Sequence, residues 1–198
     1  MAWNTEETRR RLKEAAVVEF AAHGLAGTRV ERIAARAGVN KERLYNYFGD
    51  KEQLFHSVLS DELAKIAAAV PFDAESLRDV GEYAGRCFDY HVANPHLVRL
   101  LQWEALAYGD GAVPDEEGRA AHYRRKVEAF RSAQADGVMF ASPAAADLVF
   151  LIMSLSSWWL AVPQVARMVT GQVDLAHRRA AVVEAARRMA SAQVKTSR

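Results

Sequence analysis

The sequence has few of the residues that cross-link a chain or hold a metal. Its 198 residues include one cysteine, Cys87, and its six histidines form no cluster with the spacing of zinc ligands. One thiol excludes an internal disulfide, and without a resolving partner Cys87 is better explained as a small core residue than as a redox sensor. We therefore expect no metal and no cofactor, and a reducing compartment, the cytoplasm.

Long apolar runs are also missing. No stretch reaches the roughly 18 uninterrupted apolar residues that a membrane-spanning helix needs. The first residues, MAWNTEETRRRLKEAA, lack the basic tip and apolar run of an export signal. We expect a chain that neither enters a membrane nor is exported. Hydrophobic residues still make up 51% of the chain, enough to fill a core, which argues against disorder.

The whole chain has almost no excess charge, because its formal net charge is +1. Its two parts differ, however. Residues 1–51 carry ten lysines and arginines against seven acids, a net +3, whereas the remaining residues carry 16 against 18, a net −2. A mildly basic N-terminal part on a mildly acidic remainder favours an anionic partner at the N-terminal end.

Helical periodicity, by contrast, is present along the whole chain. Leu12, Ala16 and Phe20 fall four apart, which is typical of the buried face of a helix. No run of alternating β-branched residues bounded by turns indicates a strand. Prolines at first-turn positions and glycines at helix ends mark the breaks. We predict an all-α protein with helices at about residues 5–23, 29–37, 41–48, 51–70, 73–94, 95–108, 114–136, 143–162, 163–170 and 174–194.

Local signals define the ends of the first four helices. Gly24 and Gly38 are placed to end the first two, and Thr28, Asn40 and Asp50 are placed to cap the second, third and fourth. The fourth helix is long enough to link two parts of the molecule. We therefore predict a head of three helices over residues 1–50, and over residues 51–198 the linking helix followed by a helical body.

The second and third predicted helices have the spacing of a helix-turn-helix motif. Counted from Val30, the fifth, ninth and fifteenth residues are Ala34, Gly38 and Leu44. The motif needs a small residue where its helices cross, a turn residue that tolerates positive φ, and an apolar residue beneath the second helix. Further apolar neighbours are Ile33, Ala37 and Val39. The complete set in register indicates a DNA-binding head.

The second helix of this motif has one core side and one polar side. With Leu44 and Phe48 directed inward, about 100° of rotation per residue places a mixed polar and aromatic set outward or on the flanks. Amide, guanidinium, phenol and amine groups together match the donors and acceptors of a major groove, whereas a merely solvated face has no use for tyrosines beside lysines. The set comprises Lys41, Glu42, Arg43, Tyr45, Asn46 and Tyr47.

A 35-residue span from Phe20 to Leu54 resembles the DNA-binding signature of the tetracycline-repressor (TetR) family of bacterial regulators. The span is FAAHGLAGTRVERIAARAGVNKERLYNYFGDKEQL. The likeness lies in HG before the second helix, GT at its start, IA…AGV across the turn and LYNYF…KEQL through and beyond the third helix. The resemblance implies a transcriptional regulator, most often a repressor, that binds a palindromic operator in double-stranded DNA as a homodimer and responds to a small-molecule effector.

The resemblance also implies roles for individual residues. Thr28 and Lys51 would contact phosphates, and Asn40 would cap the recognition helix. Contacts with the DNA backbone or bases are implied for Lys41, Tyr45 and Tyr47. Arg29 and Arg32 flank the second helix, and a phosphate contact is about as well supported for them as an ordinary surface position.

Glu42 and Arg43 depart from the family's pattern, which usually has small residues at these two positions. Arg43 can read a guanine edge. Glu42 can accept from a cytosine amine, or it can pair with a neighbouring cation and hold that cation in place. We favour the second role for Glu42, because an unpaired carboxylate near phosphates is repelled. Together with Asn46, these are the residues where sequence preference is expected to reside.

The body is expected to hold the effector. Ligand sites are mostly apolar with a few convergent polar groups, although aromatic residues at helical spacing are more often plain core. We predict an effector site formed by Phe88, His91, Trp103, Glu104, Tyr123, Phe150 and Trp158, with Tyr83, Tyr108, His122 and Phe130 as further candidates.

The helix predicted over 143–162 is apolar on almost every side, so it must be buried on almost every side. A body of this size can cover one side, and we expect a second copy of the chain to cover the other. Two-fold pairing would place two heads about one DNA turn (~34 Å), or a multiple of it, apart. The predicted dimer interface comprises Ile152, Leu155, Trp159, Val182, Val183, Ala186 and Met189.

Two alternatives stay open beside a ligand-responsive regulator. One is a DNA-binding regulator that has no small-molecule effector. The other is an all-helical enzyme that uses Glu104 with His91 or His122 as acid and base. The enzyme is disfavoured, because the sequence has no nucleophile elbow, metal-ligand spacing or phosphate-binding loop.

Overall fold

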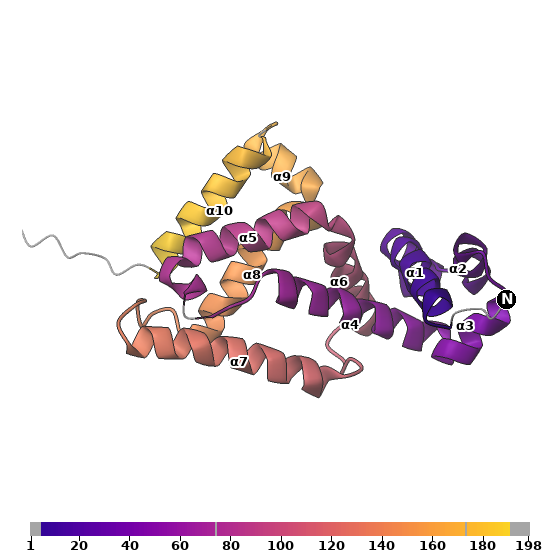
Figure 1. Cartoon of the computed structure of the whole chain (residues 1–198). Coiled ribbons are helices and arrows are strands. Elements are labelled where there is room, and N and C mark those ends of the chain that lie inside the picture. Colours follow the sequence, from indigo (N-terminus) through magenta and orange to yellow (C-terminus); the bar gives the residue numbers. More distant parts are fainter. Residues whose placement is uncertain (1–4, 74, 173, 191–198) are drawn as a thin grey trace, which may run out of the picture. The chain divides into compact units, whose positions relative to one another are not determined.

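A computed structural model describes residues 5–73, 75–172 and 174–190, and the regular structure in these ranges is helical throughout (Figure 1). The predicted all-α class is therefore confirmed. The elements are α1 (Thr5–Gly27), α2 (Val30–Ala37), α3 (Lys41–Phe48), α4 (Lys51–Ala69), the 3-10 helix η1 (Ser76–Asp79), α5 (Val80–Ala93), α6 (Pro95–Tyr108), α7 (Glu116–Ala135), α8 (Ala145–Ala161), α9 (Pro163–Thr170) and α10 (Leu175–Ala190).

Several helix ends differ from the prediction for local reasons. The regular part of α1 stops at Gly24 (φ 66°, ψ −176°), as expected, but one more helical turn follows it. The helix predicted over 73–94 begins as a 3-10 turn, and α7 and α8 begin two residues later than predicted. Proline begins α6 and α9 at the expected first-turn positions. The predicted end of the last helix near residue 194 lies outside the described residues.

The chain divides into two compact units. Unit 1 comprises Met1–Lys65 and Asn94–Pro114, and unit 2 comprises Ile66–Ala93 and Asp115–Arg198. The division differs from the predicted boundary at residue 50, because most of α4 and all of α6 belong to unit 1. Helix α4 is continuous across the division after Lys65, so it contributes residues to both units.

Unit 1 is built on α1, which packs against both α2 and α6. Phe20 on α1 and Phe55 on α4 are fully buried and meet edge to face, with ring centroids 5.1 Å apart. Burial of two such rings contributes about 2–3 kcal/mol each. The same core holds Leu12 and Ile33, also fully buried, so the short helix α2 is fixed on α1.

Unit 2 has α5 at its centre, with α8 and α10 packed against it (Figure 1). Two glycines allow α10 to approach closely: a Cβ on Gly81 would lie 2.6 Å from the Val183 carbonyl oxygen, and one on Gly85 would lie 2.9 Å from the Val183 side chain. Arg187 reinforces the contact by donating two hydrogen bonds, of 3.0 and 2.7 Å, to the Asp79 carboxylate. The apolar side of α10 is therefore buried against α5 of the same protomer.

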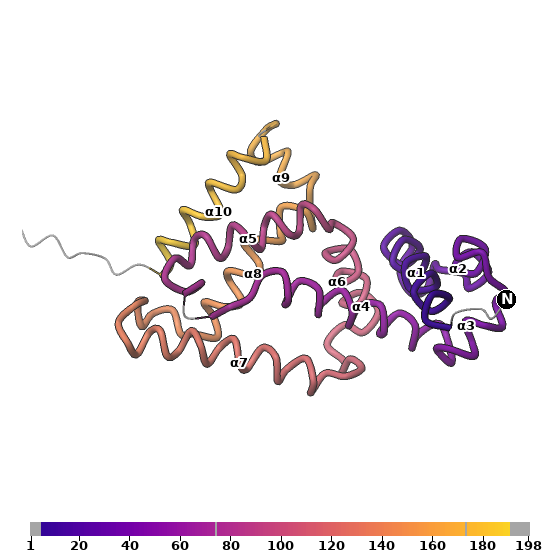
Figure 2. The backbone as a smooth tube through the Cα atoms, viewed as in Figure 1, coloured from indigo at the N-terminus to yellow at the C-terminus, as the bar shows by residue number. Residues whose placement is uncertain are grey.

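The backbone bends sharply between α8 and α9, as the tube in Figure 2 shows. The bend between Ala145–Ala161 and Pro163–Thr170 is 91°. Pro163 at the first turn of α9 explains the break, because proline cannot donate the hydrogen bond that would continue α8. Within the described residues no single helix is long and apolar enough to span a membrane, and α8 with α9 meets these criteria only as this bent pair.

Candidate DNA-binding site

The turn between α2 and α3 has the geometry that the sequence predicted. Gly38 adopts the left-handed conformation (φ 65°, ψ 37°). The Gly38 and Val39 amides donate to the Ala35 and Ala34 carbonyls at 3.1 and 3.0 Å, which closes the end of α2. Ala34, at the helix crossing, is 4% exposed, and Leu44 beneath α3 is fully buried. The helix-turn-helix prediction is therefore confirmed at the backbone and in the core.

Helix α3 is fixed at both ends. The Asn40 side chain accepts a hydrogen bond from the Glu42 amide at 2.9 Å, as predicted for a cap. The Asp50 carboxylate accepts one from the Gln53 amide at 2.7 Å and so caps α4. Phe48 at the end of α3 is 6% exposed. These contacts hold α3 as a rigid, short helix with one side on the core.

The opposite side of α3 brings most of the predicted DNA contacts onto one surface. Tyr45 is 46% exposed, which leaves its phenol accessible. The Lys41 ammonium lies 3.5 Å from the Glu31 carboxylate at the surface, so a weak ion pair orients it. The recognition surface, as we define it, comprises the exposed Lys41, Glu42, Tyr45 and Asn46 and the half-buried Arg43 and Tyr47.

Thr28 does not have the predicted role. Its side chain is 2% exposed, and its hydroxyl donates to the Glu19 carbonyl at 3.1 Å. The residue that caps α2 is Arg29, and no side chain makes a capping hydrogen bond there. The Thr28 carbonyl accepts from the Lys51 ammonium at 3.1 Å. Thr28 therefore fixes the loop before α2, and Lys51 is positioned at the same loop.

A buried carboxylate explains two of the arginines near α2. Glu19 on α1 is 6% exposed, and it accepts hydrogen bonds from Arg32 at 2.7 Å and from Arg36 at 3.3 Å. Burial raises the pKa of Glu19, but the two guanidinium groups outweigh burial and hold the pKa below its usual value. Arg32 is thus paired with Glu19 of α1, a contact that neither role considered for it, a phosphate contact or an ordinary surface position, included.

The predicted effector residues are divided between the two units. Trp103 and Glu104 lie in unit 1, where the Trp103 indole donates to the Ala21 carbonyl at 3.3 Å and its ring covers Gly24. Phe150 and Trp158 on α8 are 68% and 61% exposed. The remaining predicted members, in unit 2, are the buried Phe88 and His91 and the half-buried Tyr123. The predicted members therefore contribute to the cores of both units and to an exposed surface of α8, and their grouping into one effector site stays a prediction.

Within one protomer, the predicted interface residues belong to the core of unit 2 or lie against it. Ile152, Val182, Val183 and Ala186 are at most 6% exposed within unit 2, and Leu155, Trp159 and Met189 are half-buried against the same core. The apolar side chains that stay exposed form what we call the outer apolar face. It comprises Phe150, Leu151 and Trp158 on α8 and Val165, Met168 and Val169 on α9.

A helix-turn-helix with a rigid second helix and a polar outer side defines a DNA-binding protein of the helix-turn-helix class. The model for bacterial regulatory proteins of the tetR family matches residues 12–58, and the model for the tetracyclin repressor-like C-terminal domain matches residues 79–188. The chain belongs to the tetracycline-repressor (TetR) family of transcriptional regulators, and the resemblance found in its sequence is confirmed.

Known relatives agree with this membership. The HTH-type transcriptional repressor SCO4008 of Streptomyces coelicolor is 44% identical over 173 residues, covering 87% of this chain and 88% of the relative. The HTH-type transcriptional repressor NicS of Pseudomonas putida is 32% identical over 126 residues, 60% of this chain and 58% of the relative. The crystal structure of the putative regulator SCO4942 of S. coelicolor has a TM-score of 0.80 at 33% identity and covers 92% of this chain and 98% of that one.

The fold extends to more distant regulators. FadR of Bacillus subtilis, solved in complex with stearoyl-CoA, has a TM-score of 0.68 at 16% identity, over 90% of this chain and 97% of its own. At this identity the likeness establishes the fold alone. SCO4008 and SCO4942 are, by name, a transcriptional repressor and a transcriptional regulator.

Proposed function

We propose that the protein is a cytoplasmic transcriptional repressor that binds a palindromic operator as a homodimer and is released by a small, largely apolar effector. The observation that carries the proposal is the recognition surface of α3, a helix that lies on a buried core and is capped by Asn40 at its start and by Gly49 at its end. Membership in a family of helix-turn-helix regulators, with relatives named repressors, supports it.

Within the recognition surface we assign two kinds of contact. Lys41, Tyr45 and Tyr47, with Arg29 and Lys51 beside α3, would hold phosphates and fix the register on DNA. Arg43 and Asn46 would read base edges, with Arg43 matched to guanine. Glu42 follows the cap of α3, and its backbone amide donates to Asn40. Both earlier interpretations of its carboxylate, cytosine readout and the orientation of a cation, remain proposals.

The outer apolar face supports the homodimer. Met168 and Val169 are 74% and 78% exposed, beside Phe150 at 68% and Trp158 at 61%. Several large apolar side chains exposed on two consecutive helices are typical of an interaction site. A two-fold axis through the face would pair α8 and α9 with their copies, and the α10 residues predicted for this purpose would stay inside each protomer.

Effector control would use α4, which contributes residues to both units. By linkage, an inducer must bind the state that does not bind DNA more tightly, and DNA must weaken the inducer by the same factor. A solved protein of this fold binds stearoyl-CoA, so the fold can hold an apolar chain. The enzyme alternative is less well supported, since the relatives are transcriptional regulators by name.

Selection of bound DNA from a random pool tests the proposal most directly. A palindrome whose half-sites lie about one helical turn, or a multiple, apart is the expected product. Lys51→Ala should then weaken binding to all sequences and reduce the slope of log affinity against log salt by about 1. Arg43→Ala should relax the choice of base at one position. Enrichment of no sequence at all would contradict operator recognition.

A further inference from the structure

Unit 2 contains a lysine whose ammonium group lies among aromatic rings. Lys126 Nζ on α7 is 5.1 Å from the ring centroid of Phe72 and 5.7 Å from that of Tyr83 on α5. Within the described residues, no carboxylate forms an ion pair with Lys126. Ring faces stabilise a cation only partly, so this ammonium retains the capacity to bind an anion.

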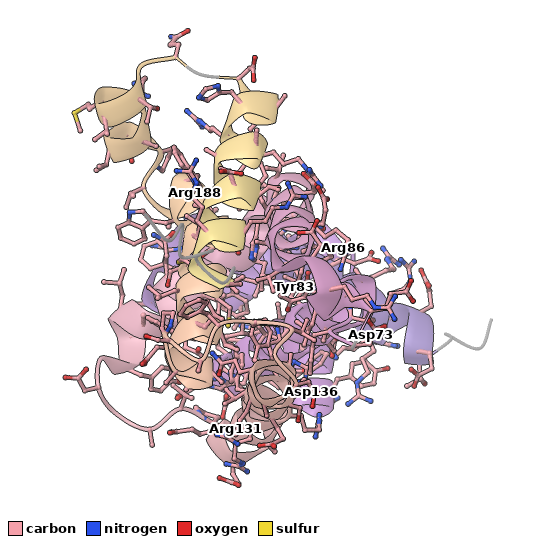
Figure 3. The ribbon with its side chains drawn as sticks, turned by 90° about the vertical axis from the view of Figure 1, so that its left-hand side faces the viewer. Asp73, Tyr83, Arg86, Arg131, Asp136 and Arg188 are labelled. Atoms are coloured by element: carbon pink, nitrogen blue, oxygen red, sulfur yellow. The ribbon has the colours of Figure 1, made fainter. Side chains whose placement is uncertain are left out.

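A second polar group on α5 also lacks a partner. Tyr83, Cys87 and His91 fall four residues apart and so share one side of α5, where Tyr83 is labelled in Figure 3. His91 is 7% exposed, and its Nδ1 has no hydrogen-bond partner among the described groups. A buried polar atom in this state costs stability unless something binds it.

The groups around Lys126 include a second cation, since the Arg86 guanidinium lies 6.0 Å from the ring centroid of Tyr83, and several neutral groups. Burial raises the pKa of Cys87 and of Tyr83, which keeps the thiol and the phenol protonated. Burial lowers the pKa of His91 to about 4, which keeps its imidazole neutral. The aromatic walls continue through His122, whose ring centroid lies 5.6 Å from that of Phe72. The cluster thus combines the Lys126 ammonium, and the Arg86 guanidinium beside Tyr83, with neutral polar groups and ring faces.

We propose that this cluster binds an organic monocarboxylate, with the carboxylate on Lys126 and the apolar remainder along the rings of Phe72 and Tyr83. The inference rests on the proposed effector control and names the effector's chemical class. A carboxylate gains a charge-assisted hydrogen bond from the ammonium. An amide of the same shape gains no ion pair. Aromatic acids and medium-chain fatty acids share this chemistry, so both belong in the test.

Isothermal titration of the full-length protein with two matched pairs of probes tests the inference. The pairs are 2-naphthoate with 2-naphthamide, and octanoate with octanamide. At least one acid should bind roughly tenfold or more tightly than its amide, because the ion pair is charge-assisted and partly desolvated. Which acid shows the preference distinguishes an aromatic ligand from an aliphatic one.

Variants on α7 identify the group responsible. Lys126→Met keeps the apolar stem and should bind the acid and its amide with equal affinity. Arg124→Met removes an exposed charge that pairs with Glu117 on the same helix, and should leave the preference intact. Lys126→Arg keeps the positive charge and should keep the preference, which provides the test if Lys126→Met does not fold.

Three results would overturn the inference: an acid preference that persists in Lys126→Met, amides that bind as tightly as acids, or no acid binding below about 1 mM. Failure of the proposed function looks different. If an acid binds through Lys126 but leaves operator affinity unchanged, effector control fails and the site stands. If a neutral compound releases the operator from wild type and Lys126→Met alike, effector control stands and the site fails.

Discussion

His91 should make the stability of unit 2 depend on pH. Burial lowers its pKa from the ordinary 6.5 to about 4 in the folded protein. The unfolded chain therefore takes up the proton first as the pH falls, and stability is lost progressively from about pH 6.5 to about pH 4. Between pH 7 and pH 5 the linkage relation gives a loss of about 2 kcal/mol from this residue alone.

The variant His91→Phe removes the titration and keeps a ring of similar size. Urea unfolding followed by circular dichroism, at pH 7 and pH 5 and at one fixed protein concentration, should show a pH effect about 2 kcal/mol smaller than in wild type. Phe88→Leu is the control: it removes packing from the same buried side of α5 and should lower stability equally at both pH values. An unchanged pH effect in His91→Phe would refute the reasoning, because it would mean that His91 is protonated without cost.

Three further changes test other parts of the structure. Tyr45→Ala should weaken operator binding roughly tenfold in a gel-shift titration while the dimer stays intact, since one contact on the recognition surface is lost. Trp158→Glu should convert the dimer to a monomer in analytical ultracentrifugation, whereas Val138→Glu, at an exposed apolar residue outside the outer apolar face, should not. Gly24→Ala should destabilise unit 1 by about 2–4 kcal/mol, because its Cβ would lie 2.6 Å from the Trp103 ring at a positive φ; Gly109→Ala, with positive φ but open space, should cost only about 1 kcal/mol. Equal losses at the two glycines would contradict the contact with Trp103.

The helix-turn-helix was predictable because its determinants are local in the chain. Asn40 caps α3 two residues before the amide that it binds, and Gly38 adopts positive φ between two helices whose apolar residues are a few positions apart. Thr28 shows the limit of this reasoning. A threonine before a helix is typical of a cap, but its hydroxyl binds a carbonyl nine residues earlier in the chain, on α1. That carbonyl lies within reach of the Thr28 hydroxyl only because of how α1 packs in the folded unit.

The effector set could not be found from sequence for a related reason. Trp103 and Phe88 are both aromatic residues on amphipathic helices, and nothing in their spacing states that α6 packs on α1 while α5 packs on α8 and α10. Lys126 was missed because a lysine on a charged helix is typical of a solvated face. Its position between the rings of Phe72 and Tyr83, residues more than 40 positions away, is a property of the packed unit.

The outer apolar face, which we propose as the dimer interface, shows why helical periodicity alone does not predict which side of a helix is buried within one protomer. Phe150 and Ile152 are two residues apart on α8, about 200° around the helix, so that when one contacts α5 the other must point away. Both are apolar, and hydrophobicity therefore predicts two buried sides without stating which side the protomer covers. For α10, the small residues of α5 determine which side is buried, because Gly81 and Gly85 allow the Val183 backbone and side chain to approach closely. With α10 packed inside the unit, the side of α8 that carries Phe150 and Trp158 stays exposed, and this is the side that we propose for the second copy of the chain.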